Sequence, residues 1–160
     1  MPATITTTAG NLSIGGVALI NSFGAWELTG DTLAQLWLPA DQRGDDVVIP
    51  GASGVKARPR RDTATKRSLQ MVIYGDVDRL GATPANYVTG LRTNVEYLRA
   101  NVVAPPGGSS GTRSAVLTLP DATTLTEDVH VTGMQLGDMR LDGLWAKAVI
   151  EISIPSGRIS

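Results

Sequence analysis

Residues 144–154, LWAKAVIEISI, show the fold class of this chain more clearly than any other stretch. From Leu144 to Ile154 every second residue is apolar, and the positions between hold Trp, Lys, Val, Glu and Ser. A period of two separates side chains onto the two faces of a β-strand. At about 3.3 Å per residue this strand spans more than about 30 Å, which is long for a strand. Such length suits pairing beyond one subunit, and it equally suits a central strand of a self-contained sandwich.

The residues before this strand predict a β-hairpin. Ala115, Leu117 and Leu119 alternate with polar or smaller residues, and residues 120–123, PDAT, have the composition of a turn. Residues 124–131 then return as the partner strand.

Shorter strands are predicted in the first half of the chain. Gly15 and Gly16 lie in the middle of the stretch from Leu12 to Ile20, which predicts a hairpin or a bulged strand, because glycine adopts positive φ without steric cost. Further strands are predicted over residues 25–28, 33–37 and 69–74.

One helix is predicted over residues 84–102. Thr83 is placed to cap it and Pro84 to occupy its first position. Gly90 costs about 1 kcal/mol relative to alanine in a helix, so it marks a close approach of another backbone segment. A coiled coil is the competing interpretation, but two and a half heptads are too short to favour it. An apolar stripe at spacings of three and four, which should pack on the sheet, consists of Val88, Leu91, Val95, Leu98 and Val102.

Composition agrees with one mainly β domain over residues 1–160. The chain has 18 Gly, 9 Pro and few aromatic residues, and residues 104–112, APPGGSSGT, have the composition of a flexible linker. Residues 1–10 lack the pattern of a signal peptide, and no apolar run is long enough for a membrane span. We therefore expect synthesis in a cytoplasm and no membrane partner.

The stretch from Asp45 to Gly75 contains an unusual basic segment. Two β-rich runs, residues 47–49 and 69–74, flank an extended arm over residues 50–67 that is rich in Pro, Gly and cations. Like charges repel, and ordering a backbone costs about 1–2 kcal/mol per residue, so a monomer gains little from such an arm. Six of the 14 basic residues lie in it, and they are Lys56, Arg58, Arg60, Arg61, Lys66 and Arg67.

Three interpretations of the arm are open. It could be a solvated loop, which is the usual state of a charge run. Nucleic-acid contact is disfavoured by the net charge of −1 and by the absence of aromatic residues for stacking within the arm. In the third interpretation the six basic residues form an inter-subunit contact with carboxylates such as Asp31, Asp41 or Asp46 of a neighbour, as a head-to-tail ring would require.

No set of residues predicts catalysis, a metal site or a cofactor site. The chain has no cysteine, and His130 is its one histidine, in a predicted strand between two valines. The carboxylates are scattered and lack the spacing of a calcium loop. We therefore expect the protein not to be an enzyme. An oligonucleotide- or saccharide-binding β module is the rival class, and it would need two of Trp26, Trp37 and Trp145 gathered beside carboxylates.

Several segments together carry a resemblance to a known family. In order, they are a glycine-punctuated strand region, RGDDVVIPGASGV at 43–55, the Arg-rich stretch leading to LQMVIYGD at 69–76, LRTNVEYLRANVV at 91–103, TRSAVLTLPD at 112–121, and a strand ending in IPSGR at 154–158. This order, which covers residues 11–158, resembles the distal tail proteins and related minor tail proteins of long-tailed bacteriophages.

The resemblance implies a tail-tube-like β-sandwich or split barrel with one flanking helix and an extended arm. It implies a structural virion protein, made in the host cytoplasm, that forms a homo-oligomeric ring, commonly a hexamer. That ring would join the tail tube to the tail tip or baseplate and line the channel through which DNA passes without specific binding. Its partners would be the tail tube protein and other tail-tip proteins, and a tail tube or tail-completion subunit is the alternative role. Larger members carry a second, sugar-binding domain that residues 1–160 do not include.

Overall fold

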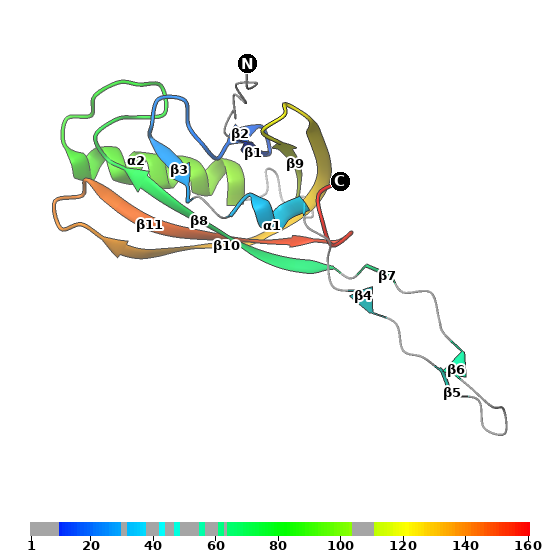
Figure 1. Ribbon diagram of the computed structural model, residues 1–160. Coiled ribbons are helices and arrows are strands. Elements are labelled where there is room, and N and C mark those ends of the chain that lie inside the picture. Colours follow the sequence, from blue (N-terminus) through cyan, green and yellow to red (C-terminus); the bar gives the residue numbers. More distant parts are fainter. Residues whose placement is uncertain are drawn as a thin grey trace, which may run out of the picture.

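One antiparallel sheet of seven strands forms the body of the protein (Figure 1). The computed structural model describes residues 10–29, 32–37, 42–43, 47–48, 55–56, 61–62, 64–103 and 111–160. In the order in which they pair, the strands are β2 (Val17–Ala18), β1 (Asn11–Ile14), β9 (Thr112–Thr118), β10 (Thr124–Met139), β11 (Trp145–Ile154), β8 (Thr65–Tyr74) and β3 (Trp26–Leu28).

The remaining elements are short apart from one helix. Helix α2 (Tyr87–Leu98) continues into a π-helical turn, η1 (Arg99–Val103), and α1 (Ala34–Trp37) is a single turn. No helix in the described ranges is long and apolar enough to span a membrane. The mainly β architecture with one flanking helix confirms the predicted fold class. Two separate two-stranded sheets are formed by β4 (Gln42–Arg43) with β7 (Arg61–Asp62) and by β5 (Val47–Val48) with β6 (Val55–Lys56).

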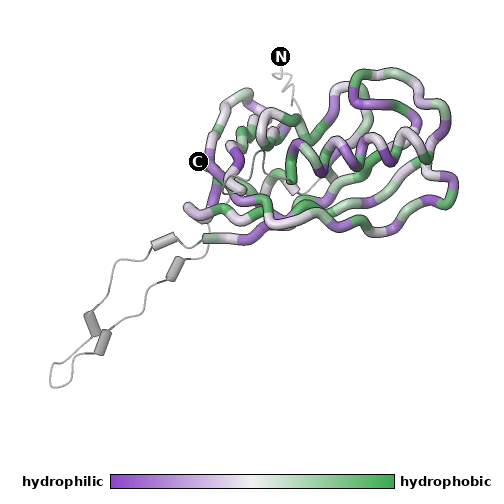
Figure 2. The backbone as a smooth tube through the Cα atoms, turned by 180° about the vertical axis from the view of Figure 1, so that it is seen from behind, coloured by the Kyte–Doolittle hydropathy of each residue, from purple (hydrophilic) through white to green (hydrophobic). Residues whose placement is uncertain are grey.

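The centre of the sheet is the long strand predicted from the C-terminal sequence. β11 pairs with β8 along its whole length, from Trp145 opposite Tyr74 to Ile154 opposite Thr65. Its alternate residues from Ala146 to Ile154 are buried, as the period of two predicts. Apolar and polar residues alternate visibly along the strands in Figure 2.

β10 is longer than predicted, with 16 residues instead of an end at Val131. Its first half pairs with β9 up to His130, and its second half pairs with β11 up to Met139. The register with β11 shifts between Val131 and Gly133 and again before Met139. Because β10 pairs with different strands along its length, it joins the two halves of the sheet.

Both predicted turns are confirmed. Gly15 and Gly16 have φ of 59° and 82° and connect β1 to β2 as a hairpin. Between β9 and β10, the backbone nitrogen of Thr123 donates a hydrogen bond of 3.0 Å to Oδ1 of Asp121. Ala122 adopts a φ of 67° in this turn, which is unusual for a residue other than glycine.

The sheet curls until its two edge strands approach each other. Nε1 of Trp26 in β3 donates a hydrogen bond of 2.9 Å to the carbonyl oxygen of Ala18 in β2. Helix α2 packs on the inner face of this curled sheet, where Leu91, Val95 and Leu98 are buried (Figure 1). The result is a split barrel with a helix on its open side.

Three predictions about local structure are wrong. Asn86, not Thr83, caps α2, because its Oδ1 accepts a hydrogen bond of 2.9 Å from the nitrogen of Thr89. Val88 is 59% exposed, although the stripe predicted burial, and it lies beside Gly143 of the β10–β11 turn at the end of the sheet. Residues 33–37 form the single helical turn α1 and not a strand; it buries Leu36, whose carbonyl accepts a hydrogen bond from the nitrogen of Ile159.

The close approach predicted at Gly90 is confirmed. A Cβ atom there would clash with the carbonyl oxygen of Gly75 and would lie 2.6 Å from Cγ of Pro84. Beside this contact, Nδ2 of the buried Asn94 donates hydrogen bonds of 2.8 and 2.9 Å to the carbonyls of Tyr74 and Val77. The helix is therefore fixed to the end of β8 by backbone contact and by one amide side chain.

Candidate assembly surfaces

The predicted basic arm lies largely outside the described residues. Arg58 and Arg60 are not among them, and Lys56 and Arg61 are described only as backbone positions in β6 and β7. The pairing of β4 with β7 and of β5 with β6 shows that the chain leaving the sheet runs beside the chain returning to it. These short strands lie beyond the N-terminal end of β8 (Figure 1).

Lys66 and Arg67 belong to the sheet, because β8 begins at Thr65. Lys66 is opposite Ser153 and its side chain is exposed. Arg67 is half-buried, and its Nε is buried without a hydrogen-bond partner among the described residues. The structure thus separates these two cations from the other four, which precede β8.

The face of the sheet opposite α2 carries exposed charges of both signs. Lys66 and Lys147 are exposed on it, and so are Glu27, Asp128 and Glu151. The Tyr74 hydroxyl donates a hydrogen bond of 2.7 Å to Oε1 of Glu27. This hydrogen bond, with a smaller contribution from burial, raises the pKa of Tyr74.

An apolar groove runs between α2 and the C-terminal half of β10. Near the start of the helix its volume is about 270 Å³, and its lining includes Val88, Leu91 and Val95 from α2 and Leu136 and Met139 from β10. Leu91 and Val95 are buried, whereas the other three side chains are largely exposed. The groove therefore presents accessible apolar surface.

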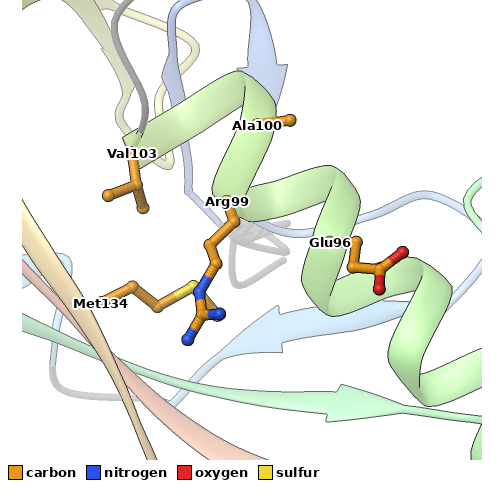
Figure 3. A pocket seen from close by; sticks show the side chains of 5 residues that line it. All are labelled: Glu96, Arg99, Ala100, Val103 and Met134. Atoms are coloured by element: carbon orange, nitrogen blue, oxygen red, sulfur yellow. The ribbon is translucent and has the colours of Figure 1, made fainter.

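The groove continues along η1. There a second hollow of about 470 Å³ is lined by Glu96, Arg99, Ala100, Val103 and Met134, and Figure 3 shows the side chain of Arg99 extending towards Met134. Glu96 and Arg99 line both hollows, so the two hollows form one continuous groove.

The rim of the groove carries a small excess of positive charge. Nε of Arg92 lies 2.9 Å from Oε1 of Glu96, one helical turn away, and both side chains are exposed. Arg99 makes no ion pair with another described residue. An exposed pair of this kind contributes little to stability, so the charges act mainly on whatever enters the groove.

Exposed apolar side chains also gather where β8 ends, and Val88 belongs both to this group and to the lining of the groove. They lie on the loop before β3, on the loop between β8 and α2, on the first turn of α2 and on the β10–β11 turn. The arm leaves from the opposite end of β8, so the arm and the apolar end are separated by the length of the sheet. This group consists of Phe23, Leu80, Tyr87, Val88 and Leu141.

The described side chains do not form the aromatic site that a saccharide- or oligonucleotide-binding module would need. Trp26 is buried and stacks on Tyr97 at 5.9 Å, and the guanidinium of Arg79 covers that ring at 4.6 Å. Trp145 lies on the other face of the sheet with Lys147 6.0 Å from its ring, and the side chain of Trp37 is outside the described residues. The hollow beside Trp26 has no carboxylate among its described lining residues.

No described group of side chains points to a metal or a catalytic site. No three of the described His, Asp and Glu residues lie close enough together to hold a metal ion. His130 is exposed, and its Nδ1 lies 3.4 Å from the hydroxyl of Thr112 on the paired strand.

Comparison with known proteins shows a similarity of fold. No protein-family model matches the chain, and no curated protein matches its sequence. A similar structure is the crystal structure of the Dit (gp 19.1) protein of SPP1, described as a paradigm of the hub adsorption apparatus in phages that infect Gram-positive bacteria. The TM-score is 0.55 with 15% sequence identity, over 94% of this chain and 51% of that one. The two proteins share a fold at this level of identity, and this chain spans about half the length of SPP1 Dit.

Sequence reasoning missed the groove on β10. The predicted strand ended at Val131, although Met134 and Leu136 alternate with Gln135 and Gly137 in the residues that follow. That alternation was a usable signal for a longer strand. The exposure of Leu136 carries no such signal, because it depends on where α2 lies.

Proposed function

We propose that this chain is a structural subunit of a phage tail that forms a homo-oligomeric ring, a hexamer, between the tail tube and the tail tip or baseplate. The observation that carries the proposal is the fold shared with SPP1 Dit over 94% of the chain. In this role the protein is not an enzyme, and it resides in the virion after synthesis in the host cytoplasm.

The arrangement of the assembly surfaces supports a ring. The arm leaves one end of β8, and exposed apolar side chains gather at the other end. Two different surfaces that bind each other produce head-to-tail contacts, which close into a ring when the rotation between subunits allows it. In the proposed ring the basic residues of the arm form the inter-subunit contact. They are Lys56, Arg58, Arg60 and Arg61, with Lys66 and Arg67 at the start of β8.

The polar face of the sheet suits the wall of a channel. Its exposed lysines are accompanied by Glu27, Asp128 and Glu151, so DNA would meet neither a strongly attractive nor a strongly repulsive surface. DNA therefore passes along this face without specific binding, while the rings above and below are formed by the tail tube protein and other tail-tip proteins.

The test is the mass of the purified chain in solution, alone and with the tail tube protein. The proposal expects one closed species of about six subunits, which joins the tube at one end only. Open-ended polymers would assign the alternative role of a tube subunit, and a monomer under every condition would reject assembly.

A substitution series tests the arm. Replacing Arg58, Arg60 and Arg61 together with serine should abolish the ring while leaving the unfolding midpoint unchanged, because these residues precede β8. The matched control removes three cations from the body of the domain, by substituting Arg140, Lys147 and Arg158, and should leave the ring intact. Equal assembly of both triple variants would show that the arm is a solvated loop.

A further inference from the structure

The second half of β10 has one edge that no described strand covers. From Val131 to Met139 it pairs with β11 on one side, and no described residue pairs with it on the other, because β9 reaches only to His130. An unpaired strand edge offers a row of backbone N–H and C=O groups to another strand. The apolar groove beneath α2 runs along this same edge, since Met134, Leu136 and Met139 line it.

An open edge beside an apolar groove fits one kind of ligand. An extended segment would form backbone hydrogen bonds with β10 and direct every second side chain into the groove. Such a segment needs small or apolar residues at alternate positions, and it should carry no basic side chains, because Arg92 and Arg99 already give the rim a positive excess over Glu96.

We propose that residues 1–9 of a second copy of this chain occupy the groove as an added strand on β10. The sequence MPATITTTA contains no charged side chain and is rich in β-branched residues. Met1, Ala3 and Ile5 alternate with residues that are polar or suited to the exposed face. The basic arm fits less well, because its cations would meet those of the rim.

The same subunit cannot supply this segment. Asn11 is level with Thr118 and Thr124, at the end of β9 far from the open edge. The eight steps along the strand from Thr124 to Thr132 span about 26 Å, and the edge continues for about 23 Å beyond Thr132. Residues 1–9 reach at most about 30 Å even when fully extended. They could touch the start of the edge of their own subunit but could not run along it.

This inference rests on the proposed ring, since it needs a second copy within reach. The chain has no cysteine, so introduced cysteines are its only thiols. One variant, Gln135→Cys, carries its new thiol on the exposed face of β10. It is mixed in turn with one of three variants, Thr4→Cys, Ile5→Cys or Thr6→Cys. Each mixture is allowed to assemble and is then oxidised. With Ile5 in the groove, Thr4 and Thr6 share the face of Gln135. Disulfide-linked dimers are expected with cysteine at position 4 or 6 and not at position 5.

Two matched substitutions locate the contact. Leu136→Asp places a charge in the groove and should reduce the linked fraction about tenfold, whereas Leu141→Asp, on the β10–β11 turn outside the groove, should not change it. Both leucines are exposed, so neither change should unfold the domain.

The experiment distinguishes failure of the groove proposal from failure of the ring proposal. Rings that form without any disulfide at positions 4, 5 or 6 overturn the inference and leave the ring standing. If the chain stays monomeric, the ring proposal fails, and residues 1–9 are then added as a free peptide to the full chain. Amide chemical-shift changes confined to residues 134–139 and to α2 and η1 would support the groove as the binding site, and their absence would overturn it.

Discussion

Replacing Gly90 with alanine should destabilise this protein, although the same change stabilises an ordinary helix. Alanine is favoured over glycine within a helix by about 1 kcal/mol. In α2, however, the new Cβ would overlap the carbonyl oxygen of Gly75 and lie 3.0 Å from the carbonyl carbon of the same residue. These are backbone atoms, so no change of side-chain rotamer relieves the overlap.

The structure sets the size of this effect. Overpacking costs about 1–3 kcal/mol and occasionally more, and a contact between two backbone segments lies at the upper end because α2 and the end of β8 must separate. After subtraction of the helix-propensity gain, we expect the free energy of unfolding to fall by about 2 kcal/mol. For a domain of this size the melting temperature should fall by about 4–8 °C.

Urea denaturation followed by circular dichroism measures the change directly. The midpoint should fall while the slope stays constant, since the surface exposed on unfolding is nearly unchanged. Gly133→Ala is the matched control, because a Cβ there has no atom within 4 Å, and it should leave stability unchanged or raise it by up to about 1 kcal/mol. A Gly90→Ala midpoint equal to or above that of the parent protein would refute the close approach.

Two further predictions concern neighbouring residues. Asn94→Leu should lower the free energy of unfolding by about 2–4 kcal/mol in the same assay, because the carbonyls of Tyr74 and Val77 lose their hydrogen-bond donor. The control Asn101→Leu should lower it less, because Asn101 donates a hydrogen bond only to the preceding helical turn. The pKa of Tyr74 is raised in the folded state, so its contribution to stability is fully present below the ordinary tyrosine pKa of about 10 and is lost as the pH rises through the folded value. Glu27→Gln should move the phenolate absorbance titration of Tyr74 down towards that ordinary value, and an unchanged titration would exclude the carboxylate as the cause.

The strands were predictable because each is buried on one face only. The apolar residues that alternate from Leu144 to Ile154 and from Leu69 to Ile73 lie on the buried face of each strand. The turns at Gly15–Gly16 and at residues 120–123 were predictable because their residue types suit the required backbone angles.

The helix limits and α1 were less predictable because several residues compete for the same role. Thr83 and Asn86 are both good caps, and only Asn86 has the nitrogen of Thr89 in reach. The apolar residues 33–37 fit a strand as well as a helical turn. Contact between Leu36 and the residues after β11, including Ile159, accompanies the helical turn.

By itself the sequence determined where the chain is extended, where it turns and that one amphipathic helix packs on a sheet. Those properties depend on neighbours along the chain, through side-chain period and backbone preference. Only the tertiary structure decided that β10 keeps, beside an apolar groove, an edge that no described strand covers, and that Gly75 and Gly90 touch. Strand edges and backbone contacts join residues far apart in the sequence. No local sequence pattern therefore predicts where β9 stops pairing with β10 or which glycine lies against another backbone segment.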